Sequence, residues 1–250
     1  MAVLTRKFHP EPNSKLFDPK TGSCSIEYYN ACRDPYRVAP DNKIPVPWRW
    51  DVKKTSDSSE DIFARFDERI RGVLKSHGIK THNIGVHNLA SRYPPQMAKD
   101  TIIISTHDEP DGSWKKAASE IYYGIIEPAA TSAQIQMRVE IRNEEKIYKD
   151  VYHIIRDDDV VEMLEGIQPL VNDAVMEFCG EKWSSITFYD RGLEPRDSEK
   201  VVSVIVFIRP GSVDAWEVVE GKIVGAVKSA LPSREIDIYV ELLPGLVELC

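Results

Sequence analysis

The chain has 250 residues, of which 42% are apolar and 29% are charged, a balance typical of a globular protein. Its formal net charge of −8 argues against a nucleic-acid partner, because an acidic surface repels phosphates and no basic run exceeds a pair. No apolar run approaches the ~20 residues that cross a bilayer, and the N-terminal residues lack the apolar core of a signal peptide. We therefore expect a soluble intracellular protein, in the cytoplasm, with reduced thiols and no membrane partner.

Residues 1–47 show no helical or strand periodicity and are rich in proline. This composition predicts an irregular N-terminal arm. The arm is not a purely polar tail, because Leu16, Phe17 and Tyr28 need cover from water. We expect part of it to lie against the body of the protein.

Residues 48–143 are predicted to form a first repeat that begins with a strand at about Trp48. A helix over 61–76 follows, with Ser58 as its N-cap and Gly78 as its stop. Strands are expected at 83–89 and 101–106, then a helix capped by Asp111 or Ser113, and an alternating strand at 134–141.

Residues 144–250 are predicted to form a second repeat in the same order. A strand at 147–155 precedes a long helix that Gly166 and Pro169 should kink. Strands are expected at 185–191 and 201–208, then a helix capped by Ser212 or Asp214, and a last strand at 236–242.

The two repeats share one register, because Trp114 and Trp216 are 102 residues apart and the same shift aligns apolar positions up to Ile121 and Ile223, starting at Val73. One residue is lost near the end, so residues 138–141 match residues 239–242 at a shift of 101. Each repeat reads β-α-β-β-α-β, so we expect an α+β fold of two tandem ferredoxin-like repeats. Proline at positions 45 and 47 fits poorly with a central first strand, which is why we start that strand near Trp48.

The third strand of each repeat, 101–106 and 201–208, is almost continuously apolar, which indicates burial on both faces. We therefore expect the two sheets to pack face to face as an intramolecular pseudo-dimer. From about Trp48 to Leu242, this arrangement resembles, in element order only, the α+β barrels of antibiotic-biosynthesis-type monooxygenases and some haem-binding relatives. The resemblance implies a shared architecture and carries no catalytic residue to this chain.

Six polar side chains are expected to point toward a pocket between the sheets: His87, Arg138, Glu140, Tyr189, Tyr239 and Glu241. Glu140 and Glu241 occupy equivalent positions in the repeat. Paired carboxylates can share a proton or hold a metal, and the competing interpretation is that they face water or pair with Arg138.

Other candidate sites have weaker patterns. The acidic loop of His107, Asp108, Glu109 and Asp111 could attract a cation, but its counterpart around Arg209 has lost the acids, so a solvated helix-entry loop is favoured. The cysteines and histidines show no metal-binding spacing, and Cys179 is expected to be buried and inert. We predict no metal and no cofactor.

The function that these patterns favour is a non-enzymatic binding or protein-interaction module on the duplicated scaffold, with a small molecule or a protein as its partner. The alternative is a small-molecule enzyme of the α+β-barrel type, such as a cofactor-independent oxygenase, isomerase or lyase, that uses a cavity between the sheets.

Overall fold

A computed structural model describes residues 3–11, 15–40, 50–91, 98–148, 152–191, 201–231 and 237–245. The chain is an α+β protein that divides into two compact units. Unit 1 contains residues 1–33 and 149–250, and unit 2 contains residues 34–148. At the ends of unit 2, the backbone N–H of Tyr148 donates to Asp34 Oδ2 at 2.9 Å. Unit 2 is therefore an insertion whose two ends are joined by a hydrogen bond.

Unit 2 contains a five-stranded sheet in the order β4-β8-β7-β6-β5. The pairs β5–β6, β6–β7 and β4–β8 are antiparallel, and β7–β8 is parallel. The bounds are β4 Arg37–Val38, β5 Trp50–Lys53, β6 Thr81–Ser91, β7 Lys99–Thr106 and β8 Met137–Arg142.

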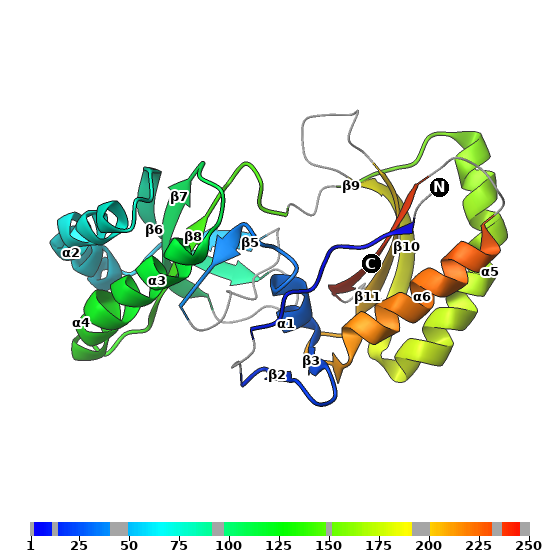
Figure 1. The fold of residues 1–250 in the computed structure, drawn as a ribbon, viewed down its shortest axis with the longest axis horizontal. Coiled ribbons are helices and arrows are strands. Elements are labelled where there is room, and N and C mark those ends of the chain that lie inside the picture. Colours follow the sequence, from blue (N-terminus) through cyan, green and yellow to red (C-terminus); the bar gives the residue numbers. More distant parts are fainter. Residues whose placement is uncertain are drawn as a thin grey trace. The chain divides into compact units, whose positions relative to one another are not determined.

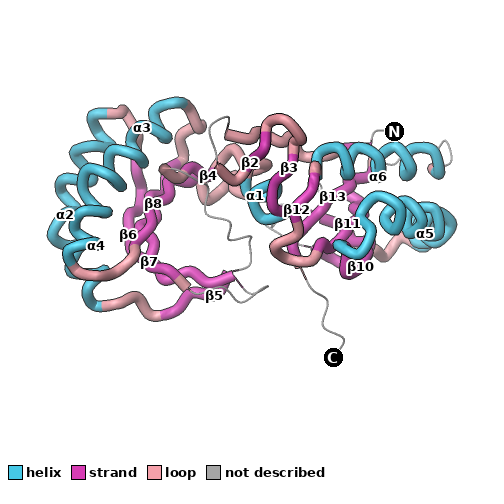
Figure 2. The backbone as a smooth tube through the Cα atoms, turned by 90° about the horizontal axis from the view of Figure 1, so that it is seen from below, coloured by secondary structure: helices cyan, strands magenta, loops and turns pink. Residues whose placement is uncertain are grey.

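Helices cover one face of the unit 2 sheet (Figures 1 and 2). They are α2 Asp57–Ser76, α3 Gly112–Ile121, η1 Tyr122–Ile126 and α4 Glu127–Ser132. Ser56, not Ser58, caps α2, since its side chain accepts the N–H of Ser59. Gly78 follows the helix with φ of +74°, a conformation that glycine adopts without a Cβ penalty. The expected cap at Asp111 is confirmed for α3.

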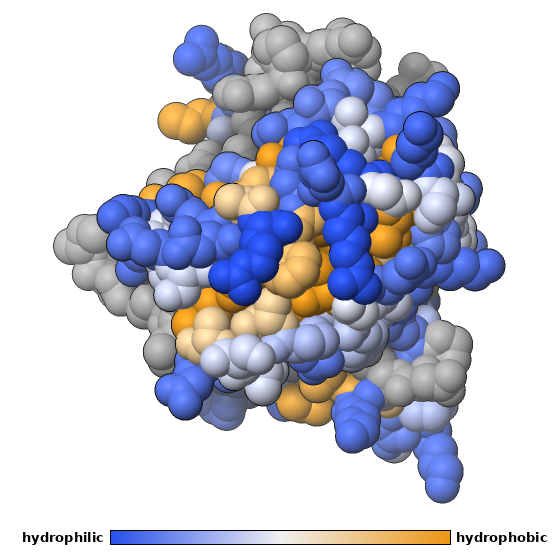
Figure 3. Space-filling view, turned by 90° about the vertical axis from the view of Figure 1, so that its left-hand side faces the viewer, coloured by the Kyte–Doolittle hydropathy of each residue, from blue (hydrophilic) through white to orange (hydrophobic). Residues whose placement is uncertain are grey.

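A π-helix, η1, joins α3 to α4, and Pro128 lies in the first turn of α4. Proline has no N–H to donate to the Gly124 carbonyl four residues earlier, and Arg69 Nη2 donates to that carbonyl at 3.3 Å instead. Figure 3 views unit 2 from the side of its helices, where apolar surface is framed by hydrophilic residues. Partly buried apolar side chains of α2, η1 and α4 pack against the core of unit 2: Phe63, Phe66, Val73, Tyr122 and Ala129.

Unit 1 contains a second five-stranded sheet, in the order β1-β13-β11-β10-β9. The pairs β9–β10 and β10–β11 are antiparallel, whereas β11–β13 and β1–β13 are parallel. The bounds are β1 Val3–Leu4, β9 Tyr152–His153, β10 Trp183–Arg191, β11 Val201–Ile208 and β13 Ile238–Pro244. A small sheet adds β12 Val213–Asp214, β3 Ser23–Ser25 and β2 Phe17–Asp18.

The helices of unit 1 are α1 Ile26–Ala31, α5 Asp158–Cys179, η2 Gly180–Lys182 and α6 Trp216–Ala230. Helices α5 and α6 cover one face of the sheet, and α1 packs beside β13 (Figures 1 and 2). The N-cap of α6 is Ala215, so the predicted capping by Ser212 or Asp214 is wrong. Pro169 lies inside α5, as the sequence indicates.

The strand ladders of the two units have the same register. Ile84 pairs with Ile104 in unit 2, and the residues 102 positions later, Ile186 and Val206, pair in unit 1. Both hairpins have an irregularity at the same place, between Thr81 and Asn83 and between Trp183 and Ser185. The parallel pairs agree as well, since Ile103 is opposite Glu140 and Ile205 is opposite Glu241.

The strand order differs from the ferredoxin-like order that the element sequence predicts. A ferredoxin-like first strand is central, but β5 lies at an edge and pairs with β6, the next strand in sequence. An edge position also removes the difficulty with proline, which is tolerated at sheet edges. Residues 41–49, including Trp48 and the two prolines before it, lie outside the described residues.

Part of the predicted irregular arm has regular structure. Residues 1–40 contain β1, β2, β3, α1 and β4, and two of these strands complete the five-stranded sheets. β1 pairs with β13 in unit 1, and β4 pairs with β8 in unit 2. The side chains of Tyr28 and Tyr29 are buried in the core of unit 1 because α1 packs there.

Candidate functional site

Unit 2 has a polar sheet face opposite its helices. Ile84, Ile102 and Val139 belong to the core beneath the helices. Since side chains alternate along a strand, the neighbouring positions point to the other face. This polar face of unit 2 carries the following residues of β6, β7 and β8: Gly85, His87, Thr101, Ile103, Ser105, Arg138, Glu140 and Arg142.

Glu140 is buried in this face and bound by one arginine. Arg37 of β4 donates from Nε to Oε1 at 2.7 Å and from Nη2 to Oε2 at 2.9 Å. Only 1% of Glu140 is exposed, so the two-bond geometry compensates for desolvation of the carboxylate. The partner is thus Arg37 and not Arg138, which corrects the pairing that the sequence suggested.

A second ion pair lies at the end of the same face. Arg142 Nη2 donates to Glu144 Oε1 at 2.7 Å, and Ser105 Oγ donates to the same oxygen at 2.8 Å. Burial would raise the pKa of Glu144, but these donors outweigh it and hold the pKa below its usual value. Glu144 is therefore ionised at neutral pH and already engaged.

His87, Thr101 and Arg138 form a row across three neighbouring strands. His87 is half-buried, and burial, followed by the nearby Arg142 charge, lowers its pKa, so the imidazole is neutral at pH 7. Arg138 is also half-buried, and burial lowers its pKa although Glu140 opposes this. Within the described residues, no hydrogen bond or ion pair holds the Arg138 guanidinium.

Unit 1 has the equivalent polar face, with different residues. Tyr189, Ser203 and Tyr239 form the row that corresponds to His87, Thr101 and Arg138. The ring of Tyr189 packs against that of Tyr152, with 4.7 Å between the centroids. This row therefore presents aromatic surface and hydroxyl groups in place of an imidazole and a guanidinium.

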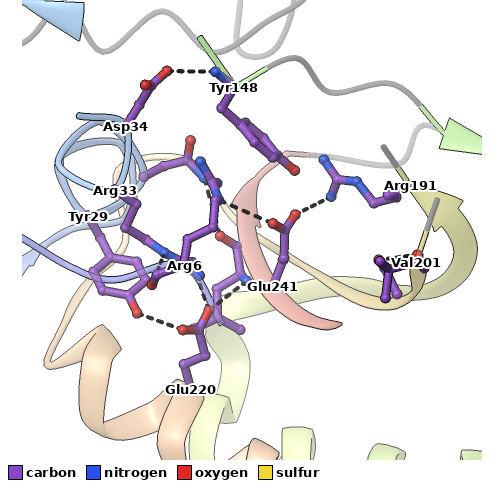
Figure 4. A network of polar contacts seen from close by, with 12 residues as sticks. Arg6, Tyr29, Arg33, Asp34, Tyr148, Arg191, Val201, Glu220 and Glu241 are labelled. Atoms are coloured by element: carbon purple, nitrogen blue, oxygen red, sulfur yellow. Dashed lines mark hydrogen bonds and ion pairs between the residues drawn. The ribbon is translucent and has the colours of Figure 1, made fainter. Parts of the chain in front are cut away.

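Glu241, the equivalent of Glu140, is also buried and bound by arginine (Figure 4). Arg6 Nε donates to Oε1 at 3.2 Å, and Arg191 Nη1 donates to Oε2. Burial would raise the pKa of Glu241, but Arg191 and Arg6 keep it below its usual value. Two guanidinium groups thus fix this carboxylate in its charged form.

A further buried carboxylate, Glu220 of α6, joins the same network (Figure 4). It accepts hydrogen bonds from Arg33 Nη1 at 2.7 Å and from Tyr29 Oη at 3.0 Å. Arg33 also donates from Nε to the Arg6 carbonyl at 3.0 Å, so it connects α1, α6 and the N-terminal strand segment. This network stabilises the N-terminal segment on unit 1.

The six residues proposed for a pocket thus fall into two groups of three. His87, Arg138 and Glu140 share the polar face of unit 2. Tyr189, Tyr239 and Glu241 share the equivalent face of unit 1. A pocket between the sheets stays a prediction, because each unit is described by itself. The arginines that bind the glutamates were missed: Arg6, Arg33, Arg37 and Arg191. No sequence spacing links them to their partners.

The side chains of the acidic loop, residues 107–111, make structural contacts. Asp111 caps α3, and the backbone N–H of Lys80 donates to Asp108 Oδ2 at 2.8 Å. Glu109 pairs with Lys146, and His107 Nδ1 lies 3.3 Å from Glu145 Oε1. The described residues contain no group of three or more His, Cys, Asp or Glu side chains that could hold a metal ion.

Burial raises the pKa of two cysteine thiols, Cys24 and Cys179, to about 12 in each case. Both thiols are protonated at neutral pH, because desolvation disfavours the thiolate. This agrees with the expectation that Cys179 is buried and inert.

No family model matches the sequence, and the searches of curated proteins and of solved structures give no match either. None of the helices in the described parts of the chain combines the length and apolarity needed to cross a bilayer.

Proposed function

We propose that this protein is a non-enzymatic binding module built from two copies of one α+β unit, and that unit 2 holds a small polar molecule on its polar face. The shared ladder register supports duplication, as does the shared irregularity at the start of each hairpin. The equivalence of Glu140 and Glu241, each buried and bound by arginine, is further support. Face-to-face packing of the two sheets remains part of this proposal.

The observation that carries the binding proposal is the state of Arg138. A guanidinium that is withdrawn from water costs free energy unless a partner compensates for the lost solvation. Glu140 and Glu144, the carboxylates of this face, already accept from other arginines. Arg138 therefore retains donors that can bind a ligand, in the same row as the neutral imidazole of His87. The Thr101 hydroxyl between them already donates to the Lys99 carbonyl at 3.1 Å.

His87 supports the alternative, a small-molecule enzyme. Its lowered pKa keeps the imidazole neutral at pH 7, the form that accepts a proton in general base catalysis. Arg138 could then bind and orient the substrate. In this second candidate function His87 acts on the ligand, whereas in the first it only contacts it.

Thermal-shift screening of the full chain against a metabolite collection tests the binding proposal, because a ligand of the folded state raises the melting temperature. We expect stabilising compounds whose effect is lost in Arg138→Gln and kept in Arg71→Gln, a matched change at an exposed arginine of α2. Each such compound is then incubated with the protein and analysed by mass spectrometry. Unchanged compound supports a binding module, and conversion that His87→Gln abolishes supports the enzyme. The binding proposal fails if no stabilising compound depends on Arg138.

A further inference from the structure

We infer that the ligand of unit 2 carries an oxyanion, a carboxylate or a phosphate group, which binds between Arg138 and His87 above Thr101. This inference deepens the proposed function and rests on it. It names the chemistry that the polar face of unit 2 recognises.

The strand register brings the two side chains to one place. His87 is opposite Thr101 on β7, and Thr101 is opposite Arg138 on β8. Directly paired residues point to the same face, and neighbouring strands are about 4.8 Å apart, so His87 and Arg138 start about 10 Å apart. The Arg138 side chain is long enough to span most of this distance toward the imidazole, which lies over Gly85 of its own strand.

Gly85 makes room for the imidazole. A Cβ at position 85 would lie 3.3 Å from His87 Nε2, which is tighter than an ordinary contact. The ring therefore lies over Gly85, on the same face as Thr101 and Ile103. A larger residue at position 85 would force His87 to move.

Charge selects an anion over other ligands. Arg138 offers fixed N–H donors in a planar arrangement that matches two oxygens of a carboxylate or phosphate. A neutral His87 adds one N–H donor. A cationic ligand would meet repulsion from Arg138 and from Arg142, whose charge already lowers the pKa of His87.

The equivalent face of unit 1 lacks these groups. Tyr189 and Tyr239 stand where unit 2 has His87 and Arg138. A phenol is a weaker partner for an anion than a guanidinium, because it carries no charge. The oxyanion site should therefore be confined to unit 2.

The test uses the full chain labelled with ¹³C in its histidine rings, with the His87 resonance assigned from His87→Gln. Sodium phosphate and sodium acetate are titrated separately at constant ionic strength, with sodium chloride as the balancing salt. We expect at least one of them to shift the His87 resonance saturably and to raise the pKa of His87, because a bound anion favours the imidazolium. Arg138→Gln should weaken binding about tenfold or more, and Arg71→Gln should leave it unchanged.

The two anions distinguish the sources of the oxyanion. Binding of phosphate alone points to a phosphorylated ligand, and binding of acetate alone points to a carboxylic acid. Equal shifts in the native chain and in Arg138→Gln would overturn the inference. If neither anion binds while an uncharged screening compound stabilises the protein through Arg138, the oxyanion inference fails and the binding proposal stands. If no probe and no compound depends on Arg138, both fail.

Discussion

The polar faces of the two sheets share a framework and differ in the residues on it. At the equivalent positions Glu140 and Glu241, both sheets have a buried glutamate bound by arginine. One row further along the strands, unit 1 has Tyr189 and Tyr239, whereas unit 2 has His87 and Arg138.

The difference separates stability from recognition. The glutamates are tied to arginines that come in part from residues 1–40, so they fix the N-terminal strands to each sheet. His87 and Arg138 form no such tie within the described part of the chain. We infer that the shared residues hold the fold and that the residues that differ determine binding.

Removal of the shared glutamates should have the largest effect. Glu241→Ala leaves two buried guanidinium groups without their carboxylate and should destabilise unit 1 by about 4–5 kcal/mol, and Glu140→Ala should destabilise unit 2 by about 3 kcal/mol. Hydrogen exchange with mass spectrometry should localise faster exchange to β10, β11 and β13 in the first variant and to β6, β7 and β8 in the second. If exchange increased less in Glu241→Ala than in Glu140→Ala, the expectation that two orphaned arginines cost more than one would be wrong.

A second carboxylate in unit 2 links a strand to a helix, and the equivalent position in unit 1 is not acidic. Asp100 accepts hydrogen bonds from Ser56 Oγ at 2.6 Å, Ser59 Oγ at 2.7 Å and Asn88 Nδ2 at 2.7 Å, which join β7 to the start of α2. The position 102 residues later is Val202. Asp100→Asn should therefore destabilise unit 2 by about 2 kcal/mol at pH 7, because the bonds to a charged acceptor are weakened.

The effect of Asp100 should depend on pH. Burial would raise its pKa, but the bonds from Ser56, Ser59 and Asn88 hold it below the usual value. A depressed folded-state pKa contributes stability above the unfolded pKa of about 3.9, and this contribution is lost as the pH falls through the folded-state value. In urea unfolding, the difference between the native chain and Asp100→Asn should shrink below about pH 4. A difference that is constant with pH would show that the carboxylate charge does not matter.

Exchange of the differing residues should affect binding far more than stability. The double variant His87→Tyr with Arg138→Tyr gives unit 2 the row of unit 1 and should change the free energy of unfolding by less than about 1 kcal/mol, because both positions are half-buried and unpaired in the described residues. It should lose the phosphate or acetate response. If the folded double variant still bound phosphate or acetate, His87 and Arg138 would not be the residues that determine binding.

The smallest expected effect concerns the helices that connect the parallel strands, which are β7 and β8 in unit 2 and β11 and β13 in unit 1. Unit 2 has the π-helix η1 between α3 and α4, where Arg69 donates to the Gly124 carbonyl, whereas α6 of unit 1 is a single α-helix. Arg69→Ala should cost about 0.5–1 kcal/mol in urea unfolding, since this bond is exposed. In a Pro128→Ala background, where a backbone N–H is restored, the same change should cost less. An equal cost in both backgrounds would show that Arg69 does not replace the backbone N–H that Pro128 lacks.

Much of the secondary structure followed from local pattern. The shift of 102 residues between Trp114 and Trp216 recurs in the ladders, and the apolar third strands are buried along most of their length. The order of strands did not follow, because the same β-α-β-β-α-β sequence is compatible with a central or an edge first strand. The candidate residues His87 and Arg138 could be named from alternation along strands, whereas Arg37 could not, since it lies 103 positions from Glu140.

The sequence by itself determined most of the helices and strands after residue 50, the spacing at which they recur and the alternation of side chains on each strand, because these depend on local patterns. It missed the short strands and the helix of residues 1–40. Only the tertiary structure decided which arginine neutralises each buried glutamate, which strand lies at the edge, and that Arg138 has no such bond to any described residue. Those outcomes depend on pairing between distant segments, and the free-energy differences between alternative pairings are not encoded in any local pattern.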